Sequence, residues 1–214
     1  MYTILLCIIL LFLIKLKIQK RRIVAVASAC SDISDIKELC HEHDVDLIVY
    51  DKCGQCKNAP DGVKCIPRKN VGREQETFLG FVVDNYKNLP DDLLFIALPL
   101  HKHSRKDRIR HMIKNDIVGC HVSIEDQANF TLDEHEGQTQ HPSPVRPFKA
   151  WFETFVAPWD SSLKSACWNG IMKTTKERIL QKPKSFYQTL LDQLSTHNSH
   201  EVGHFIERSM GSVF

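Results

Sequence analysis

Short apolar runs of strand length recur along this chain and alternate with segments of helical periodicity. Clear runs cover residues 23–29, 46–50 and 93–98, and a shorter strand is expected near residues 63–66. Nearly continuous apolar runs of this length are typical of parallel strands whose two faces are covered by helices. The pattern therefore predicts an α/β domain with an open, mostly parallel sheet flanked by helices.

The strongest helical signal lies at residues 75–89, between the last two of these strands. Its apolar residues fall on one side of a helical wheel, which predicts a helix lying on the core. Weaker signals in the rest of the chain predict helices at 34–43, 174–180, 184–194 and 201–214, strands near 117–124 and 166–172, and a long loop at 125–147.

Polar residues gather where the predicted strands end. Ser31, Asp32 and Asp51 follow the first two strands, and the turn at residues 70–74 precedes the main helix. Because ligands of such sheets bind beyond the carboxyl ends of the strands, we expect these residues on one rim. The helix start offers free N–H groups, and Asn70, Gly72 and Arg73 suit a phosphate. The alternative is a capped helix with a solvated basic turn.

The final predicted helix carries a second group of candidates. Glu201, His204 and Arg208 share one side of it, with Glu207 nearby, and this set suits acid–base chemistry. A charged helical face is otherwise simply solvated. His103, just after the fourth strand, is a further candidate.

The first 14 residues are uncharged and rich in Leu and Ile, and a basic cluster follows at residues 15–22. We interpret residues 1–20 as a single-pass membrane anchor and residues 21–214 as a single α/β domain; a cleaved signal peptide is the competing interpretation. The positive-inside rule would leave the domain in the cytosol, whereas a lumenal enzyme needs the opposite orientation, so the side of the membrane stays open. The glycosylation sequon at Asn129 has meaning only in a lumenal domain.

Composition narrows the choice of partner. The 28 basic residues are nearly balanced by 26 acidic ones, so nucleic acid is not expected as a partner. Among the eight cysteines, Cys53 and Cys56 form a Cys-x-x-Cys pair. Zinc binding, a redox pair and structural or free thiols are all open interpretations of it.

Several motifs together resemble one known family. They are Asn-Val-Gly-Arg-Glu at 70–74, Thr-Phe-Leu at 77–79, Asp-Asn-Tyr at 84–86, Leu-Pro-Asp at 89–91, Pro-Lys-Ser-Phe-Tyr at 183–187, Glu-Val-Gly-His at 201–204 and Glu-Arg-Ser at 207–209. This set resembles the family called domain of unknown function 3431, which is similar to glycosyltransferases of the GT-A kind. The resemblance implies a nucleotide-sugar site. The residues that match the family motifs are Asn70, Gly72, Arg73, Glu74, His103, Glu201, His204, Glu207 and Arg208.

The resemblance leads to a functional hypothesis: a membrane-anchored, glycosyltransferase-like protein that uses a nucleotide-sugar donor and a glycan acceptor. The base of the donor would meet Ser31, Asp32 and Asp51, its diphosphate would meet the turn at 70–73, and Glu201, His204 or Glu207 would activate the acceptor. The strand at 93–98 lacks an Asp-x-Asp motif, so no metal site is predicted and the cofactor is unknown. The alternative is a non-catalytic relative that binds a glycan or a protein at the membrane. An enzyme needs these residues in one cleft, whereas a binding module can scatter them.

Overall fold

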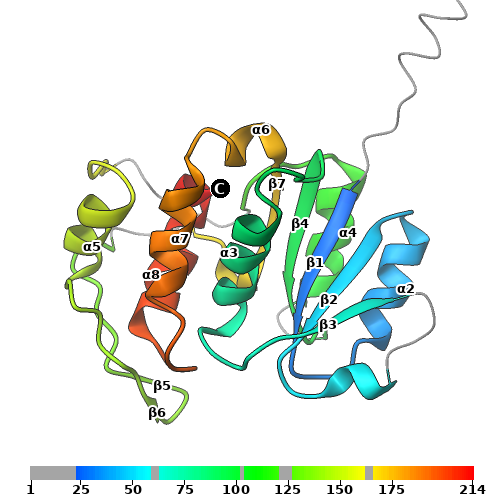
Figure 1. Cartoon of the computed structure of the whole chain (residues 1–214), viewed down its shortest axis with the longest axis horizontal. Coiled ribbons are helices and arrows are strands. Elements are labelled where there is room, and N and C mark those ends of the chain that lie inside the picture. The colour runs from blue at the N-terminus through cyan, green and yellow to red at the C-terminus, as the bar shows by residue number, and fades with distance from the viewer. Residues whose placement is uncertain (1–22, 59–62, 102–103, 121–126, 162–165) are drawn as a thin grey trace, which may run out of the picture.

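The computed structural model describes residues 23–58, 63–101, 104–120, 127–161 and 166–214 (Figure 1). Its main sheet has five strands in the order β3-β2-β1-β4-β7. The first four strands of the chain run parallel and β7 is antiparallel to β4, so the predicted open, mostly parallel α/β sheet is confirmed. The strands are β1 (Ile23–Ala29), β2 (Asp46–Asp51), β3 (Lys64–Pro67), β4 (Asp92–Ala97) and β7 (Ile171–Thr175).

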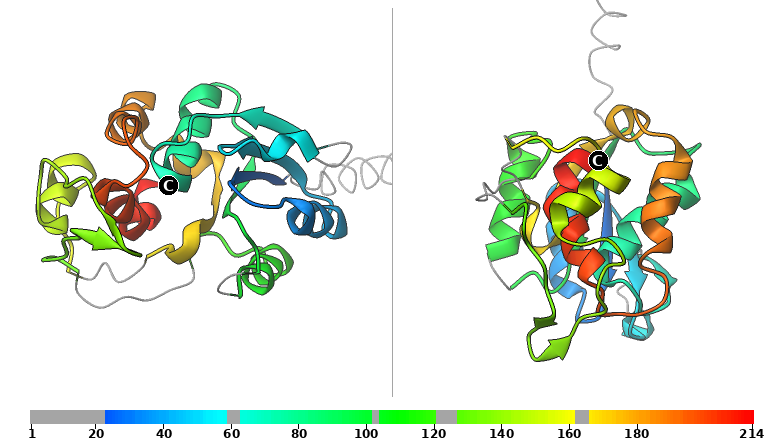
Figure 2. Two further views of the ribbon diagram at one scale, coloured as in Figure 1. Left: turned by 90° about the horizontal axis from the view of Figure 1, so that it is seen from below. Right: turned by 90° about the vertical axis from the view of Figure 1, so that its left-hand side faces the viewer.

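Helices cover both faces of the sheet, as the left view of Figure 2 shows. One face carries α2 (Ser34–Glu42) and α4 (Arg105–Lys114). The other face carries α3 (Arg73–Asn85), α7 (Lys184–Asp192) and α8 (Glu201–Val213), and α5 (Phe148–Phe155) packs outside on α8.

The alternation of side chains along β1 explains the two layers. Val24 and Val26 enter the core beneath α3 and α8, whereas Ala25 and Ala27 enter the core beneath α2 and α4. Successive side chains of a strand point to opposite faces, so one buried strand serves both cores.

Helix α3 is more deeply buried than its sequence predicts. Every residue from 75 to 83 is buried, including Glu76, because α3 lies between the sheet and the helices α7 and α8. A helical wheel identifies the side that faces the sheet, but it does not reveal a second layer of helices over the other side.

The C-terminal third agrees with the sequence except around residue 170. Helices α7 and α8 lie where they are predicted, and the Thr175 hydroxyl accepts a hydrogen bond from the Arg178 N–H at the start of α6 (Lys176–Ile179). The strand predicted at 166–172 begins later, at Ile171, because residues 168–170 form the 3-10 turn η3. Asn169 and Gly170 in this turn have left-handed backbone angles, with φ of 67° and 61°.

Two other segments also differ from expectation. The predicted loop at 125–147 contains, among its described residues, a short hairpin of β5 (Glu134–His135) and β6 (Gln138–Thr139). Of the strand predicted near 117–124, residues 117–120 are described, and Gly119 forms a single bridge to Lys173.

The cysteines of the described domain are mostly paired. Disulfides join Cys30 to Cys53, Cys56 to Cys65 and Cys120 to Cys167. The remaining described cysteine, Cys40, is a buried thiol whose pKa burial raises to about 12. The structure therefore favours structural cysteines over a redox-active Cys-x-x-Cys pair, because Cys53 and Cys56 each bond to a different partner.

The predicted membrane anchor at residues 1–20 lies outside the described residues. Among the described helices, none has the length and apolar character needed to span a bilayer. The described part of the chain begins with Ile23, at the amino end of β1, which lies at the top of the sheet in Figure 1.

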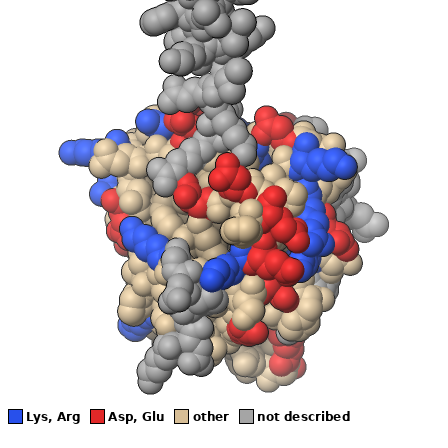
Figure 3. All heavy atoms as spheres, turned by 90° about the vertical axis from the view of Figure 1, so that its right-hand side faces the viewer, with Lys and Arg blue, Asp and Glu red and all other residues tan. Residues whose placement is uncertain are grey.

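Charge on the surface is mixed in sign. Figure 3 shows Asp and Glu side chains beside Lys and Arg side chains on the face of the molecule that is on the right in Figure 1. Charged side chains also pair between the helices α2 and α4: Lys106 of α4 contacts Glu38 of α2 at 3.0 Å, and Arg110 contacts Glu42 at 3.1 Å.

Candidate functional site

A cavity of about 400 Å³ opens at the carboxyl end of β4. It lies near the place where the strand order reverses, since β2 and β3 extend the sheet from one side of β1 and β4 from the other. Ligands of open α/β sheets bind at such a switch point. The walls come from the start of α3, the β4–α4 connection, the segment around β5, the turn η3 and α8. The lining residues are Arg73, Glu74, Gln75, Leu98, Pro99, Arg105, Phe130, Leu132, His135, Glu136, Trp168, Asn169, Gly203, His204, Glu207 and Arg208.

The start of α3 forms one wall and has no side-chain cap. Gly72 precedes it with φ of 59°, and a Cβ atom there would lie 2.7 Å from the Leu194 Cβ. The close approach of the chain after α7 and the left-handed backbone both require glycine. Since the first N–H groups of a helix have no partner within it, this end suits an anion.

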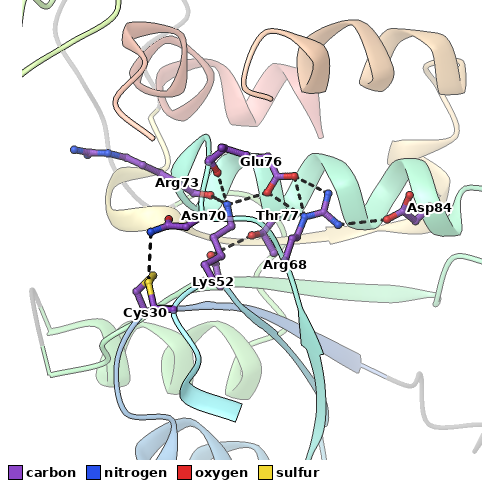
Figure 4. A network of polar contacts seen from close by, with 11 residues as sticks. Cys30, Lys52, Arg68, Asn70, Arg73, Glu76, Thr77 and Asp84 are labelled. Carbon is purple, nitrogen blue, oxygen red and sulfur yellow. Dashed lines mark hydrogen bonds and ion pairs between the residues drawn. A yellow bond between two sulfur atoms is a disulfide. The ribbon is translucent and has the colours of Figure 1, made fainter. Parts of the chain in front are cut away.

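A buried lysine fixes this turn (Figure 4). The Lys52 ammonium donates hydrogen bonds of 2.5 Å to the carbonyl oxygens of Val71 and Arg73, and its Nζ lies 2.8 Å from the Glu76 carboxylate. Arg68 also pairs with Glu76, at 2.7 Å. Lys52 is therefore a positioning residue, which ties the end of β2 to the start of α3.

Two further arginines line the cavity. The Arg105 guanidinium donates hydrogen bonds to the carbonyl oxygens of Ala97 and Pro99, at 3.2 and 3.0 Å. Arg208 lies between two rings, with its Cζ 3.4 Å from the centre of Phe130 and 4.6 Å from the centre of Trp168. Burial lowers the pKa of both arginines, that of Arg208 to about 10. Guanidinium groups in proteins nevertheless stay protonated at neutral pH. Such buried, pre-oriented guanidinium groups suit a phosphate or carboxylate ligand.

His204 forms a neutral part of the wall. Burial lowers its pKa to about 3, assisted by the charges of Arg73, His135 and Arg208. The His135 ring meets the His204 ring edge-on, with the ring centres 4.7 Å apart. An imidazole with so low a pKa is a weak base at neutral pH.

Glu207 has the opposite shift. Burial raises its pKa to about 7, and the nearby charge of Glu74 adds to this effect. One carboxylate oxygen accepts a hydrogen bond of 2.8 Å from the Asn169 N–H. Glu207 therefore exchanges its proton near neutral pH, which is the property expected of a general acid or base.

Glu74 approaches the turn η3 closely. A Cβ atom on Gly170 would lie 2.8 Å from the Glu74 Cγ, and the φ of Gly170 is 61°. Glycine at this position therefore allows the start of α3, with its carboxylate, to lie against the turn that holds Glu207.

Three side chains that line the cavity have buried polar atoms without a partner among the described residues. They are the Gln75 Oε1, the Arg105 Nε and the His204 Nε2. Most buried polar atoms in folded proteins have a hydrogen-bond partner, so a cluster of unpartnered ones indicates a place for ligand or water. The cluster offers an acceptor, a cationic donor and an imidazole.

Some of the site residues predicted from the sequence line the cavity, and others do not. Arg73, Glu74, His204, Glu207 and Arg208 line this single cavity, although α3 and α8 are distant in sequence. His103 lies outside the described residues.

The predicted residues near the first two strands lie on the same edge of the sheet but do not line the cavity. The Asp51 carboxylate accepts hydrogen bonds from the N–H groups of Cys53 and Cys56, which lower its pKa although burial opposes this. Asp32 accepts from the Ser34 N–H and hydroxyl at the start of α2. Ser31 is partly buried, and its hydroxyl oxygen has no partner among the described residues.

Two predicted residues have structural contacts instead. The Asn70 amide lies on the surface and donates to the Cys53 sulfur at 3.5 Å. Glu201 is fully buried away from the cavity, and its carboxylate accepts hydrogen bonds from the N–H groups of Leu132 and Ser143 and from Arg146.

Sequence reasoning missed Lys52, Gln75, Arg105, Phe130 and Trp168. Arg105 had a detectable signal, because it begins the helix that follows a strand end. The others have no such signal: Lys52 simply follows the second strand, and the aromatic residues reach the cavity only through tertiary packing.

One group of potential metal ligands lies in the described part of the chain, Asp51 with Cys56 and Cys65. The two sulfurs are bonded to each other, so they do not act as thiolate ligands.

A second hollow, of about 590 Å³, lies at the amino ends of β1 and β2 and is lined by Asp46, Lys64 and Asn85 among others. We favour the smaller cavity as the site because side chains with strongly shifted pKa values and side chains with unpartnered polar atoms line it.

Comparison with known proteins gives one match. Residues 23–119 match the model of a family described as protein of unknown function (DUF3431). That range includes β1 to β4 and the α3 and α4 walls of the cavity, whereas the walls from α8 and η3 lie beyond it. Neither a curated protein nor a solved structure shows significant similarity to the chain.

Proposed function

We propose that this protein transfers a sugar from a nucleotide-sugar donor to an acceptor hydroxyl, at the cavity between α3, α4 and α8. The observation that carries the proposal is the convergence of Arg73, Arg105 and Arg208 with the acidic Glu207 around one cavity. A volume of about 400 Å³ is within the ~300–1,000 Å³ usual for small-ligand sites.

The phosphate groups of the donor would occupy the cationic side of the cavity. Arg73 and the uncapped N–H groups of α3 supply donors there, and Arg105 supplies a buried guanidinium with an unpartnered Nε. In a transfer reaction the leaving diphosphate gains negative charge as its bond to the sugar breaks. Fixed cations in a partly closed cavity stabilise that charge.

Glu207 is the proposed general base, chosen from the three candidates on α8. Glu201 is engaged by three donors away from the cavity, and His204 is too weak a base. The acceptor oxygen would bond to the sugar carbon, the bond from that carbon to the phosphate oxygen would break, and the acceptor proton would pass to Glu207. A pKa of about 7 suits this role near neutral pH.

The proposal retains the membrane attachment through residues 1–20. β1 has seven residues, so its amino end lies roughly 20 Å from its carboxyl end. A chain held to a membrane just before Ile23 would therefore have the cavity at the edge of the sheet remote from the attachment. The proposed base-binding role of Ser31, Asp32 and Asp51 stays a prediction.

Calorimetry with a panel of nucleotide-sugars and free nucleotides tests the binding step on the full chain in detergent. Replacing Arg73 by alanine removes a charge-assisted contact, so we expect a loss of about 1.5–3 kcal/mol, which is roughly tenfold to a hundredfold in affinity. Arg110→Ala is the matched control, because Arg110 lies on the outer face of α4 beside Glu42. The proposal fails if no nucleotide binds, or if Arg73→Ala binds as the wild type does; a glycan- or protein-binding role would then replace it.

A further inference from the structure

Asn129 stands in the single Asn-x-Ser/Thr sequence of the chain, with Phe130 and Thr131. Asn129 and Thr131 are exposed, and the turn that holds them is closed by a hydrogen bond of 2.9 Å from the Phe130 N–H to the Gln127 carbonyl. An exposed sequon in a surface turn fits N-linked glycosylation, provided that the domain enters the secretory pathway.

The cysteines supply the independent observation on compartment. Six of the seven described cysteines form disulfides, with Cα separations of 4.8, 5.9 and 4.9 Å. These values lie inside the ~4.4–6.8 Å range of natural disulfides. Several disulfides in one domain are characteristic of secreted and lumenal proteins and rare in the cytosol.

From these two observations together we infer that the domain lies in an oxidising, lumenal or extracellular compartment and that Asn129 carries an N-linked glycan. The inference opposes the orientation that the basic cluster at residues 15–22 favours under the positive-inside rule. It holds whether residues 1–20 are retained as an anchor or removed as a signal peptide.

The position of Asn129 relates the glycan to the cavity. Its neighbour Phe130 lines the cavity and stacks on Arg208, and adjacent Cα atoms are about 3.8 Å apart. The glycan would leave the surface beside the cavity mouth. The attachment needs a lipid diphosphate-linked oligosaccharide as co-reactant: the Asn129 amide nitrogen bonds to the first sugar carbon, the bond from that carbon to the diphosphate breaks, and the nitrogen loses one proton.

The test is synthesis of the full chain with sealed microsomes, followed by gel electrophoresis with and without peptide N-glycosidase. The wild type and Thr131→Ser, which keeps the sequon, should show one glycosidase-sensitive shift. Asn129→Gln and Thr131→Ala, which destroy it at exposed positions, should show none. Six cysteines should resist alkylation until a reductant is added, and the domain should resist added protease.

Two results would overturn the inference. An unshifted, protease-sensitive wild type whose cysteines react at once would place the domain in the cytosol. If the wild type has protected cysteines but no glycan, the inferred compartment stands and the assignment of Asn129 as a glycosylation site is wrong.

Discussion

Glu201 and Glu207 lie six residues apart on the same helix, yet their surroundings differ completely. The carboxylate of Glu201 accepts hydrogen bonds of 2.7 and 2.8 Å from the Leu132 and Ser143 N–H groups and pairs with Arg146. Glu207 faces the cavity, and within the described part of the chain its carboxylate receives one hydrogen bond, from the Asn169 N–H. Burial next to Glu74 raises its pKa to about 7.

The difference shows that burial alone does not mark a reactive carboxylate. A buried carboxylate with enough donors serves as a structural anchor, and here Glu201 holds the segment around Leu132 and Ser143 against the start of α8. A buried carboxylate with few donors and a neighbouring negative charge has a shifted pKa. That state is suited to proton transfer, so Glu207 fits the proposed role of general base better than Glu201 does.

The largest expected effect is on the free energy of unfolding, which should fall much more when Glu201 is replaced than when Glu207 is. Glu201→Ala leaves the N–H groups of Leu132 and Ser143 and the Arg146 Nε without their acceptor, although Arg146 keeps its pair with Asp133. We expect a loss of about 3–5 kcal/mol in the free energy of unfolding. Glu207→Ala removes a carboxylate that is costly to bury when charged, so its loss should be under about 1 kcal/mol. Guanidinium denaturation of both variants, in the same detergent as the wild type, measures this. Equal losses would remove the distinction.

The pH dependence of stability sharpens the comparison. The pKa of Glu207 rises from 4.5 to about 7 on folding, so between these values the unfolded chain releases the proton while the folded chain keeps it. This contribution to stability is present in full below pH 4.5 and is lost as the pH rises toward 7. Its size is on the order of 3 kcal/mol. Urea titrations across this range should show a smaller decline for Glu207→Gln than for the wild type; the same slope in both would contradict the assignment.

The smallest expected effect concerns Glu74. Its negative charge contributes to the raised pKa of Glu207, so Glu74→Gln should lower that pKa toward its ordinary value while leaving stability at acidic pH nearly unchanged. Carboxylate-labelled NMR titration follows Glu207 directly. A pKa of Glu207 that does not move would show that burial alone sets the shift.

The sequence predicts the sheet and the main helices because their signals are local. The apolar runs that become β1, β2 and β4 have the period of buried strands, and the turn before α3 contains its glycine and arginine in consecutive positions. Residues 168–170 are different: they form η3 instead of the predicted start of a strand, because Asn169 and Gly170 adopt left-handed angles that an apolar pattern does not report.

The candidate site was predictable only in part. Arg73, Glu74, His204, Glu207 and Arg208 could be proposed from their motifs, but their convergence depends on how α8 packs against α3. The choice between Glu201 and Glu207 depends on which donors surround each carboxylate. Those donors come from the segments around residues 132, 143 and 169, which are remote from α8 in sequence and carry no motif.

The most direct test of the account is the rate of nucleoside diphosphate release from a panel of nucleotide-sugars, with a panel of sugar acceptors, by the wild type and Glu207→Gln. The account predicts that the wild type turns over at least one donor and that its rate rises with a midpoint near pH 7, where Glu207 loses its proton. Glu207→Gln should bind that donor normally and lose about 100-fold to 10,000-fold in kcat. A Glu207→Gln rate equal to that of the wild type, or no turnover of any donor by the wild type, would contradict the account.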